Sequence, residues 1–353
     1  MLERSHTRRR AKTSPHSKPA PSINLLYCGD RNMRDGLLIS VLSLTKHTRT
    51  PLHVFVLTAK VSTSTREFLP LRESDVEPVR ELISKHNPQG SLSLVDITDL
   101  FEAQPPVANM ETRFTPLCTL RLYADELECI PDRILYLDTD IVCHKPFEQF
   151  YNQNLDGVEL AAVLDYYGRW FFRQRYSHML PDYFNSGVLL LNMAEIRRTG
   201  LFARCREMCE NKWMFMPDQS ALNKCVRSKV IASHRYNDQR RFHSNTVFQH
   251  FTTSFRLFPW FHAVSVKPWQ VEEVHSTLHL HEYDDLLEEF EQHRAAQVQA
   301  SPVTSSVAGS PSGSTDRSPD RSFEHPLDHS MNSPINNPIN SSTDYPERID
   351  ENE

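Results

Sequence analysis

Apolar and polar positions in the first hundred residues follow two alternating patterns. Short, mostly apolar runs are separated by segments in which apolar residues recur every three or four positions, and a capping box beginning at Ser74 opens the second such segment. The runs predict strands at 23–28, 52–58 and 91–97, and the spaced segments predict helices near 37–44 and 74–83. This alternation predicts a βαβαβ unit, the first half of a doubly wound nucleotide-binding fold.

The stretch 133–142 places two carboxylates inside an apolar run. Five mostly apolar residues lead to Asp138 and Asp140, and two more apolar residues follow. The run is typical of a strand buried on both faces, and a carboxylate in such a strand needs a partner. Side chains two positions apart share a face of a strand, so the pair predicts a site for a hard cation such as Mg²⁺ or Mn²⁺.

The remainder of the chain continues the mixed pattern. A polar Asn185-Ser186-Gly187 at the start of an apolar run indicates close approach of the backbone to a ligand. Asp218 or a neighbour is expected to cap a helix that opens at 216–220, and 230–281 is aromatic-rich without a clear period. The other predicted elements are helices at 115–127, 195–212 and 282–294, and strands at 160–164 and 188–191.

Both ends differ in composition from the middle. Residues 1–21 carry six Lys and Arg against one acid, which predicts a basic disordered arm. Residues 295–353 form a predicted disordered, acidic tail rich in Ser, Pro and Asn, with too few apolar residues to offset the entropy of ordering. We therefore expect one folded domain over residues 22–294.

The cysteine pattern and the lengths of the apolar runs indicate the cellular compartment of the protein. Seven cysteines without a Cys-x-x-Cys pair indicate a reducing environment. The sequence has neither an apolar run of membrane-spanning length nor a secretory h-region. We expect a cytoplasmic protein, with peripheral contact to the inner face of a membrane left open and no nucleic-acid partner.

Six motifs, taken together, resemble glycosyltransferase family 8, the retaining, metal-dependent sugar-nucleotide transferases. Each is weak alone, but their order and spacing over about 23–269 match the family, closest to its bacterial lipopolysaccharide galactosyl- and glucosyltransferases. The motifs are LYCGDRN at 26–32, LRLY at 120–123, ILYLDTD at 134–140, YFNSGVLLLN at 183–192, DQSALN at 218–223 and VKPW at 266–269. The resemblance implies a GT-A fold, a Rossmann-like nucleotide-binding half with a mixed central sheet flanked by helices.

The resemblance also implies residue roles. Asp138 and Asp140 would be metal ligands for Mn²⁺ or Mg²⁺, and Lys267 would bind the diphosphate. Uridine and the rest of the donor would be bound by Cys28, Asp30, Asn32 and Ser186, and the sugar by the catalytic set Arg121, Asn185, Asp218 and Gln219.

The third metal ligand departs from the family pattern. The family has a histidine six residues before the lysine, followed by a glycine, and here that position is Phe261. His262 is our first choice because it lies one residue away, and His250, which opens a His-Phe-Thr echo of the family motif, is the second.

The implied reaction transfers a hexose, galactose or glucose, from a UDP-sugar to a glycan, lipid-linked or protein acceptor. The glutamine at position 219 is a poor nucleophile, so we favour attack on the same face from which the diphosphate departs over a covalent intermediate. Two other classes compete. A haloacid-dehalogenase-like phosphatase would use Asp138 as nucleophile and Asp140 as acid/base, and a non-catalytic protein would only bind the sugar nucleotide.

Overall fold

The computed structural model describes residues 22–112, 115–166, 182–239, 242–256 and 262–300. The predicted basic arm and almost all of the predicted acidic tail lie outside these residues. The strands are β1 (Ile23–Gly29), β2 (Leu52–Thr58), β3 (Val61–Ser62), β4 (Glu67–Phe68), β5 (Ser91–Asp96), β6 (Arg133–Leu137), β7 (Ile141–Cys143), β8 (Leu160–Leu164), β9 (Phe184–Asn192), β10 (Lys229–Ala232), β11 (Phe248–His250), β12 (Ser254–Arg256) and β13 (His262–Val264).

The helices alternate with these strands along the chain. Those of α type are α1 (Arg34–Thr45), α2 (Glu73–His86), α3 (Thr98–Ala103), α4 (Glu148–Tyr151), α6 (Met193–Thr199), α7 (Leu201–Asn211), α8 (Pro217–Cys225), α9 (Val271–Ser276) and α10 (Asp284–Ala300). Those of 3₁₀ type are η1 (Arg31–Met33), η2 (Val107–Asn109), η3 (Pro116–Glu126) and η4 (His234–Tyr236). In the part of the chain that the structure describes, no helix combines the length and apolar character needed to cross a bilayer.

A seven-stranded mixed sheet forms the centre of the domain, with strand order β10-β8-β9-β6-β1-β2-β5. Strands β5, β2, β1 and β6 are mutually parallel, whereas β9 runs antiparallel to both β6 and β8. The mixed α/β fold that we expected is thus confirmed.

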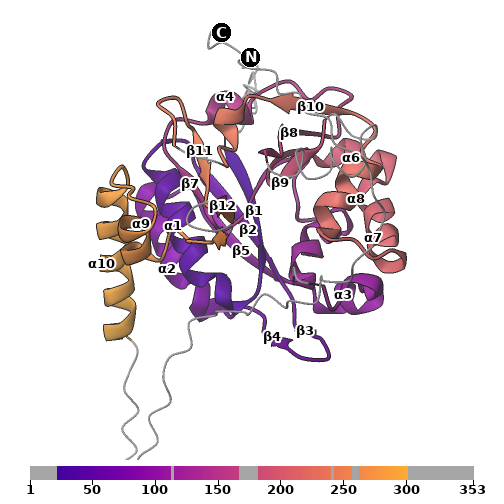
Figure 1. The fold of residues 1–353 in the computed structure, drawn as a ribbon, viewed down its shortest axis with the longest axis horizontal. Coiled ribbons are helices and arrows are strands. Elements are labelled where there is room, and N and C mark those ends of the chain that lie inside the picture. Colours follow the sequence, from indigo (N-terminus) through magenta and orange to yellow (C-terminus); the bar gives the residue numbers. More distant parts are fainter. Residues whose placement is uncertain (1–21, 113–114, 167–181, 240–241, 257–261, 301–353) are drawn as a thin grey trace, which may run out of the picture. The chain divides into compact units, whose positions relative to one another are not determined.

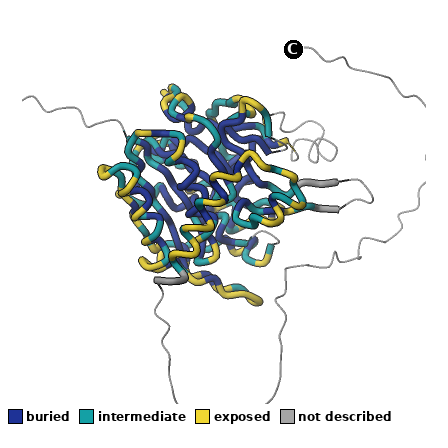
Figure 2. Tube along the Cα trace, turned by 90° about the vertical axis from the view of Figure 1, so that its left-hand side faces the viewer, coloured by how far each residue is buried: buried dark blue, intermediate teal, exposed yellow. Residues whose placement is uncertain are grey.

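Helices cover the two faces of this sheet in separate layers (Figure 1). On one face, Leu37 of α1, Val79 of α2 and Phe290 of α10 pack into one apolar core. On the other, Leu120 of η3 and Phe202 of α7 belong to a second core. The inner strands β1, β6, β8 and β9 are buried on both sides, which explains why their sequences show apolar runs without alternation. Figure 2 shows this continuous buried interior beneath an exposed shell.

Three predicted elements differ in their local structure. The predicted helix 195–212 is two helices, α6 and α7, because Gly200 between them takes a left-handed conformation at φ 66°. The predicted helix 115–127 forms as the 3₁₀ helix η3. The predicted strand 133–142 ends at Leu137, and a turn separates it from β7.

Helix ends also differ from the expectation. Helix α2 begins at Glu73, and the carboxylate of Asp75 accepts the backbone N–H of Arg72 at 2.8 Å, so Ser74 is not its cap. Helix α8 begins at Pro217, and no side chain caps it. Helix α10 extends to Ala300, beyond the expected domain end at residue 294.

Candidate active site

The candidate site lies where the order of the parallel strands reverses. The chain forms β1, adds β2 and β5 on one side of it, and then adds β6 on the other side. In such sheets a crevice opens at the carboxyl ends of the two strands that flank the reversal. Asp30 follows β1 and Asp138 follows β6, so both acidic residues stand at this edge.

The two metal-ligand candidates lie in the turn after β6. The backbone N–H of Asp138 donates to the carbonyl of Gly187 on β9 at 2.8 Å, and the N–H of Ile141 donates to the carbonyl of Asp138 at 3.2 Å. Our prediction of one continuous strand over 133–142 is therefore wrong, because this turn separates β6 from β7. The turn, rather than strand alternation, brings the carboxylates of Asp138 and Asp140 together.

Strand β11 brings His250 to the same point. Strands β7 and β11 are antiparallel, with His250 directly opposite Ile141, and the N–H of Phe251 donates to the carbonyl of Asp140 at 3.0 Å. The structure thus brings our second choice, His250, beside both carboxylates. Our first choice, His262, begins β13, and its side chain lies outside the described part of the structure.

Asp138, Asp140 and His250, hereafter the three-ligand group, have the spacing of metal ligands. The Nε2 atom of His250 lies 3.1 Å from Oδ1 of Asp140 and 3.8 Å from Oδ2 of Asp138. Ligands held about 2.1 Å from one ion in an octahedron lie about 3.0 Å apart.

One carboxylate oxygen of this group has no hydrogen-bond partner. Oδ1 of Asp140 is buried and makes no hydrogen bond, although the imidazole nitrogen is 3.1 Å away. A buried carboxylate oxygen without a hydrogen bond is costly, and a bound cation removes that cost. One imidazole with two carboxylates suits Mn²⁺, so the residues present fit a divalent metal.

Two cations flank the three-ligand group. The Nζ atom of Lys267 lies 2.5 Å from Oδ2 of Asp140, and a guanidinium nitrogen of Arg121 lies 3.1 Å from Oδ1 of Asp138. Burial by itself would raise the pKa of Asp140, but the ammonium group of Lys267 outweighs that effect and holds the pKa well below its usual range. Asp140 is therefore ionised, as a metal ligand must be.

Arg121 is fixed on several sides at once. Its guanidinium lies 3.9 Å from the centre of the Tyr136 ring and donates to the carbonyl of Ser186 at 2.6 Å. It also pairs with Asp218 at 3.4 Å, and the hydroxyl of Tyr136 donates to Oδ1 of Asp138 at 2.6 Å. Arg121 therefore joins the metal side of the site to the start of helix α8.

Residues assigned to the donor sugar meet beside Arg121. Ser186 donates through its N–H to Oε1 of Gln219 at 2.9 Å and through its hydroxyl to Asp218 at 3.1 Å. The Nε2 atom of Gln219 donates to Asp165 at 2.8 Å, and Asn185 donates to the same oxygen at 3.4 Å. The start of β9 and the first turn of α8 thus form one polar wall.

The residues assigned to the nucleoside lie at the end of β1. Asp30 is buried, and both of its oxygens accept hydrogen bonds from Asn32, at 3.2 Å from the backbone and 2.8 Å from the side chain. Burial raises the pKa of Asp30, although these hydrogen bonds oppose the shift. Burial likewise raises the pKa of the Cys28 thiol, so Cys28 stays protonated and supplies shape rather than charge.

Sequence reasoning missed two buried polar residues that belong to this site. Asp165 directly follows the predicted strand 160–164, so it carries the same signal that drew attention to Asp138, a carboxylate at a strand's carboxyl end. Asn237 contacts His250 and Asn185, and it lies in the segment where no period was visible. No sequence signal pointed to it.

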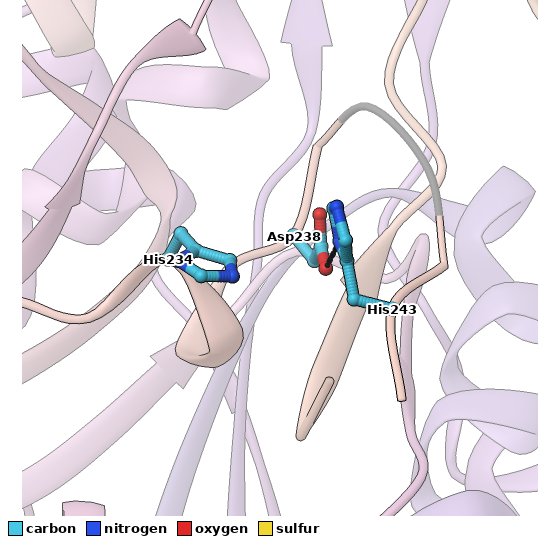
Figure 3. A group of neighbouring side chains, drawn as sticks. All are labelled: His234, Asp238 and His243. Atoms are coloured by element: carbon cyan, nitrogen blue, oxygen red, sulfur yellow. Dashed lines mark hydrogen bonds and ion pairs between the residues drawn. The ribbon is translucent and has the colours of Figure 1, made fainter. Parts of the chain in front are cut away.

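Two other groups of His and Asp occur in the described residues. In the first, shown in Figure 3, Asp238 and His243 face one another and His234 approaches from η4. Nδ1 of His243 lies 2.6 Å from Oδ2 of Asp238, and Thr246 donates to that same oxygen at 2.6 Å. Tetrahedral ligands of one zinc ion lie about 3.3 Å apart, so this is a hydrogen-bonded loop anchor. The second group, His275, His281 and Asp284, is mostly exposed.

Comparison with known proteins gives the class. A model of the family described as Glycosyl transferase family 8 matches residues 24–273, more than half of the chain. The chain therefore belongs to glycosyltransferase family 8, whose members transfer sugars, and the phosphatase alternative loses its basis.

Curated relatives match part of the chain. Lipopolysaccharide glucosyltransferase WaaO of Escherichia coli K12 is 32% identical over 117 residues, which are 30% of this chain and 34% of the relative. Lipopolysaccharide 1,2-glucosyltransferase of the same organism is 24% identical over 215 residues, which are 59% of this chain and 60% of the relative. This chain thus spans less than two thirds of either relative.

Solved structures share the fold. The galactosyltransferase LgtC, solved with donor and acceptor sugar analogs, has a TM-score of 0.53 at 18% identity and covers 78% of this chain and 96% of its own. The bifunctional glycosyltransferase WbbM in its apo form has a TM-score of 0.55 at 15% identity, covering 81% and 53%. These likenesses establish the GT-A fold.

Proposed function

We propose that this protein is a retaining, metal-dependent hexosyltransferase that moves galactose or glucose from a UDP-sugar to a glycan, lipid-linked or protein acceptor. The observation that supports it most is the three-ligand group. Two carboxylates from the turn after β6 and a histidine more than 100 residues later in the sequence meet at the sheet edge where nucleotides bind, and they leave a buried carboxylate oxygen without a hydrogen bond.

Asp138, Asp140 and His250 would hold a divalent ion, with Mn²⁺ the first candidate and Mg²⁺ the second. When bound, such an ion acts as a Lewis acid on the diphosphate leaving group. Lys267 already lies against Asp140, so its ammonium is placed to pair with phosphate oxygens as negative charge develops on them.

The wall made by β9 and α8 would hold the sugar. Asp165 and Asp218 are carboxylates that can accept hydrogen bonds from sugar hydroxyls, and Asn185 can both donate and accept. Gln219 uses its amide to link Ser186 to Asp165, which is a positioning role. An amide so engaged supports same-face attack guided by the departing diphosphate over a covalent intermediate.

The nucleoside would lie at the end of β1, against Asp30 and Asn32. Both residues follow β1, which pairs with β6, the strand that Asp138 follows, so they lie at the same carboxyl edge of the sheet as the candidate metal ligands. The Asp30 carboxylate is held by Asn32, so its orientation is set before any ligand binds.

The test is a screen of nucleotide sugars for Mn²⁺-dependent release of UDP without acceptor. We expect UDP-galactose or UDP-glucose to be hydrolysed slowly, and Asp138→Ala and Asp140→Ala each to reduce the rate by at least about 100-fold. Asp132→Ala is the matched control, because Asp132 precedes β6 and its side chain is 78% exposed. Release of phosphate from a simple phosphomonoester, or full activity in EDTA, would contradict the proposal.

A further inference from the structure

A single buried asparagine connects the metal side of the site to the sugar side. Asn237 is only 1% exposed. Its Oδ1 lies 3.1 Å from Nδ1 of His250, and its Nδ2 donates to Oδ1 of Asn185 at 2.9 Å. Asn237 is therefore in direct contact with one candidate metal ligand and with one candidate sugar-binding residue.

A backbone amide determines the direction of this chain of hydrogen bonds. The N–H of Gly187 can only donate, and it donates to Oδ1 of Asn185 at 2.9 Å. The atom of Asn237 that meets the same oxygen must also be a donor, so it is the amide nitrogen. The carbonyl oxygen of Asn237 must then face His250.

The state of the imidazole follows from that orientation. Opposite a carbonyl oxygen, Nδ1 of His250 must carry the hydrogen. In the neutral ring this leaves Nε2 with a lone pair, and Nε2 is the atom that faces Asp138 and Asp140.

We propose that Asn237 is a positioning residue that holds His250 in the tautomer able to bind the metal and that couples it to Asn185. This inference rests on the proposed function, since it assumes that His250 is the third ligand. Outer hydrogen bonds of this kind fix the orientation of metal-bound histidines, and their loss lowers metal affinity by about 10- to 100-fold.

The backbone around Asn237 is itself tied to the strand that carries His250. The N–H of Asp238 donates to the carbonyl of Phe248 at 2.8 Å, and the N–H of His250 donates to the carbonyl of Asp238 at 2.9 Å. Gln239 adds a bond to the carbonyl of Asn237 at 3.3 Å. The asparagine and the histidine therefore move as one unit, which a positioning role requires.

Two substitutions separate the two contacts of Asn237. Asn237→Ala removes both, so we expect a 10- to 100-fold weaker Mn²⁺ affinity, with turnover largely recovered at saturating Mn²⁺. Asn237→Asp keeps an acceptor for His250 but sets a carboxylate oxygen against Oδ1 of Asn185. We expect it to retain Mn²⁺ affinity within about threefold while the KM for the donor rises.

The control is Asn192→Ala. Asn192 also bridges two segments, through Leu155 and the N–H of Glu195, but it lies at the opposite end of β9. It should lose stability without losing Mn²⁺ affinity. If the wild-type protein binds Mn²⁺ through His250 and the Asn237→Ala variant binds it with unchanged affinity, this inference is overturned but the proposed function is not. Absence of Mn²⁺ binding in the wild type would overturn the proposed function with it.

A further measurement needs no variant. The ¹⁵N shifts of the His250 ring in the metal-free wild type report which nitrogen is protonated. We expect hydrogen on Nδ1, and a neutral ring with hydrogen on Nε2 alone would contradict the proposal even if Asn237→Ala did not fold.

Discussion

The backbone of Gly187 lies directly against the imidazole ring of His250. A methyl group on Gly187 would stand 2.8 Å from Nδ1 of His250 and 2.9 Å from Oδ2 of Asp138, closer than real Cβ contacts allow. The glycine of the Asn-Ser-Gly motif is therefore needed because a ring and a carboxylate occupy the space where a side chain would be.

Gly187→Ala should displace His250 and disturb the three-ligand group. We expect a loss of about 1–3 kcal/mol of unfolding free energy, as for other overpacked sites, and a weaker affinity for Mn²⁺. Calorimetry of metal binding and denaturant unfolding measure the two effects. Gly157→Ala is the matched control, because it strains a left-handed residue at φ 69° with nothing within 4 Å of the added methyl. It should cost stability alone, and equal Mn²⁺ affinity in both variants would refute the steric explanation.

Arg121→Met should destabilise the fold as well as abolish transfer. The side chain of Arg121 is 5% exposed and faces Asp138 and Asp218, so its removal leaves buried negative charge without compensation. Breaking one side of such a buried pair costs about 3–5 kcal/mol. Arg121→Lys should recover part of the stability but little activity, because a lysine cannot reach Ser186, both carboxylates and the Tyr136 ring together. Urea unfolding and UDP release measure the two, and a fully active Arg121→Lys would contradict this account.

Asp140 should make the stability of the metal-free protein depend on pH. Its pKa is lowered in the folded state, so its ionisation contributes stability that is fully present above the unfolded pKa of about 4 and is lost progressively as pH falls below it. In EDTA, the difference in unfolding free energy between wild type and Asp140→Asn should therefore shrink from neutral pH towards pH 3. A difference that grew with acidification would show that Lys267 does not stabilise the carboxylate.

Cys225 should be the most reactive of the buried or half-buried thiols in the described residues. A hydrogen bond from Cys205 lowers the pKa of Cys225 to about 7, against the effect of burial, and Arg204 assists. The pKa of the partner thiol, Cys205, is raised. Alkylation by iodoacetamide, followed by mass spectrometry, should show a midpoint near pH 7 at Cys225. Cys205→Ala should move that midpoint upward, and an unshifted midpoint would exclude the hydrogen bond as the cause.

The sequence predicted the bounds of an element where buried apolar residues gave way to residues of another kind at its ends. Strand β8 has the predicted bounds because Glu159 and Asp165 flank its buried apolar run, and strand β2 has them because Pro51 precedes its apolar run and Thr58 ends it. The turn after Leu137 was not predictable, since Ile141 and Val142 are as apolar and as buried as the strand before them. The break at Gly200 carried a signal, a glycine inside a helical pattern, that we did not weigh.

The candidate site was predictable where a motif is contiguous. Asp138, Asp140, Asn185, Asp218 and Lys267 were singled out within motifs, and the fold brings them to one edge of the sheet. His250 was harder to choose, because its His-Phe-Thr motif lies far upstream of Lys267, and His262 is nearer to the position that the family pattern gives. Asn237 was not predicted, because its role depends on two contacts between residues distant in sequence. The choice between His250 and His262 as third ligand stays a prediction until metal binding is measured.

The segment between His250 and Lys267 begins and ends on one carboxylate. His250 meets Oδ1 of Asp140 and Lys267 meets Oδ2, while strands β12 and β13 pair with each other in between. Both ends of this segment are held at the same carboxylate, so it is a closed loop. Lengthening such a loop costs little entropy, because the entropy of loop closure grows only logarithmically with loop length. The segment between His250 and Lys267 is thus a place where insertions could change acceptor recognition during evolution without displacing Asp140 and its two neighbours.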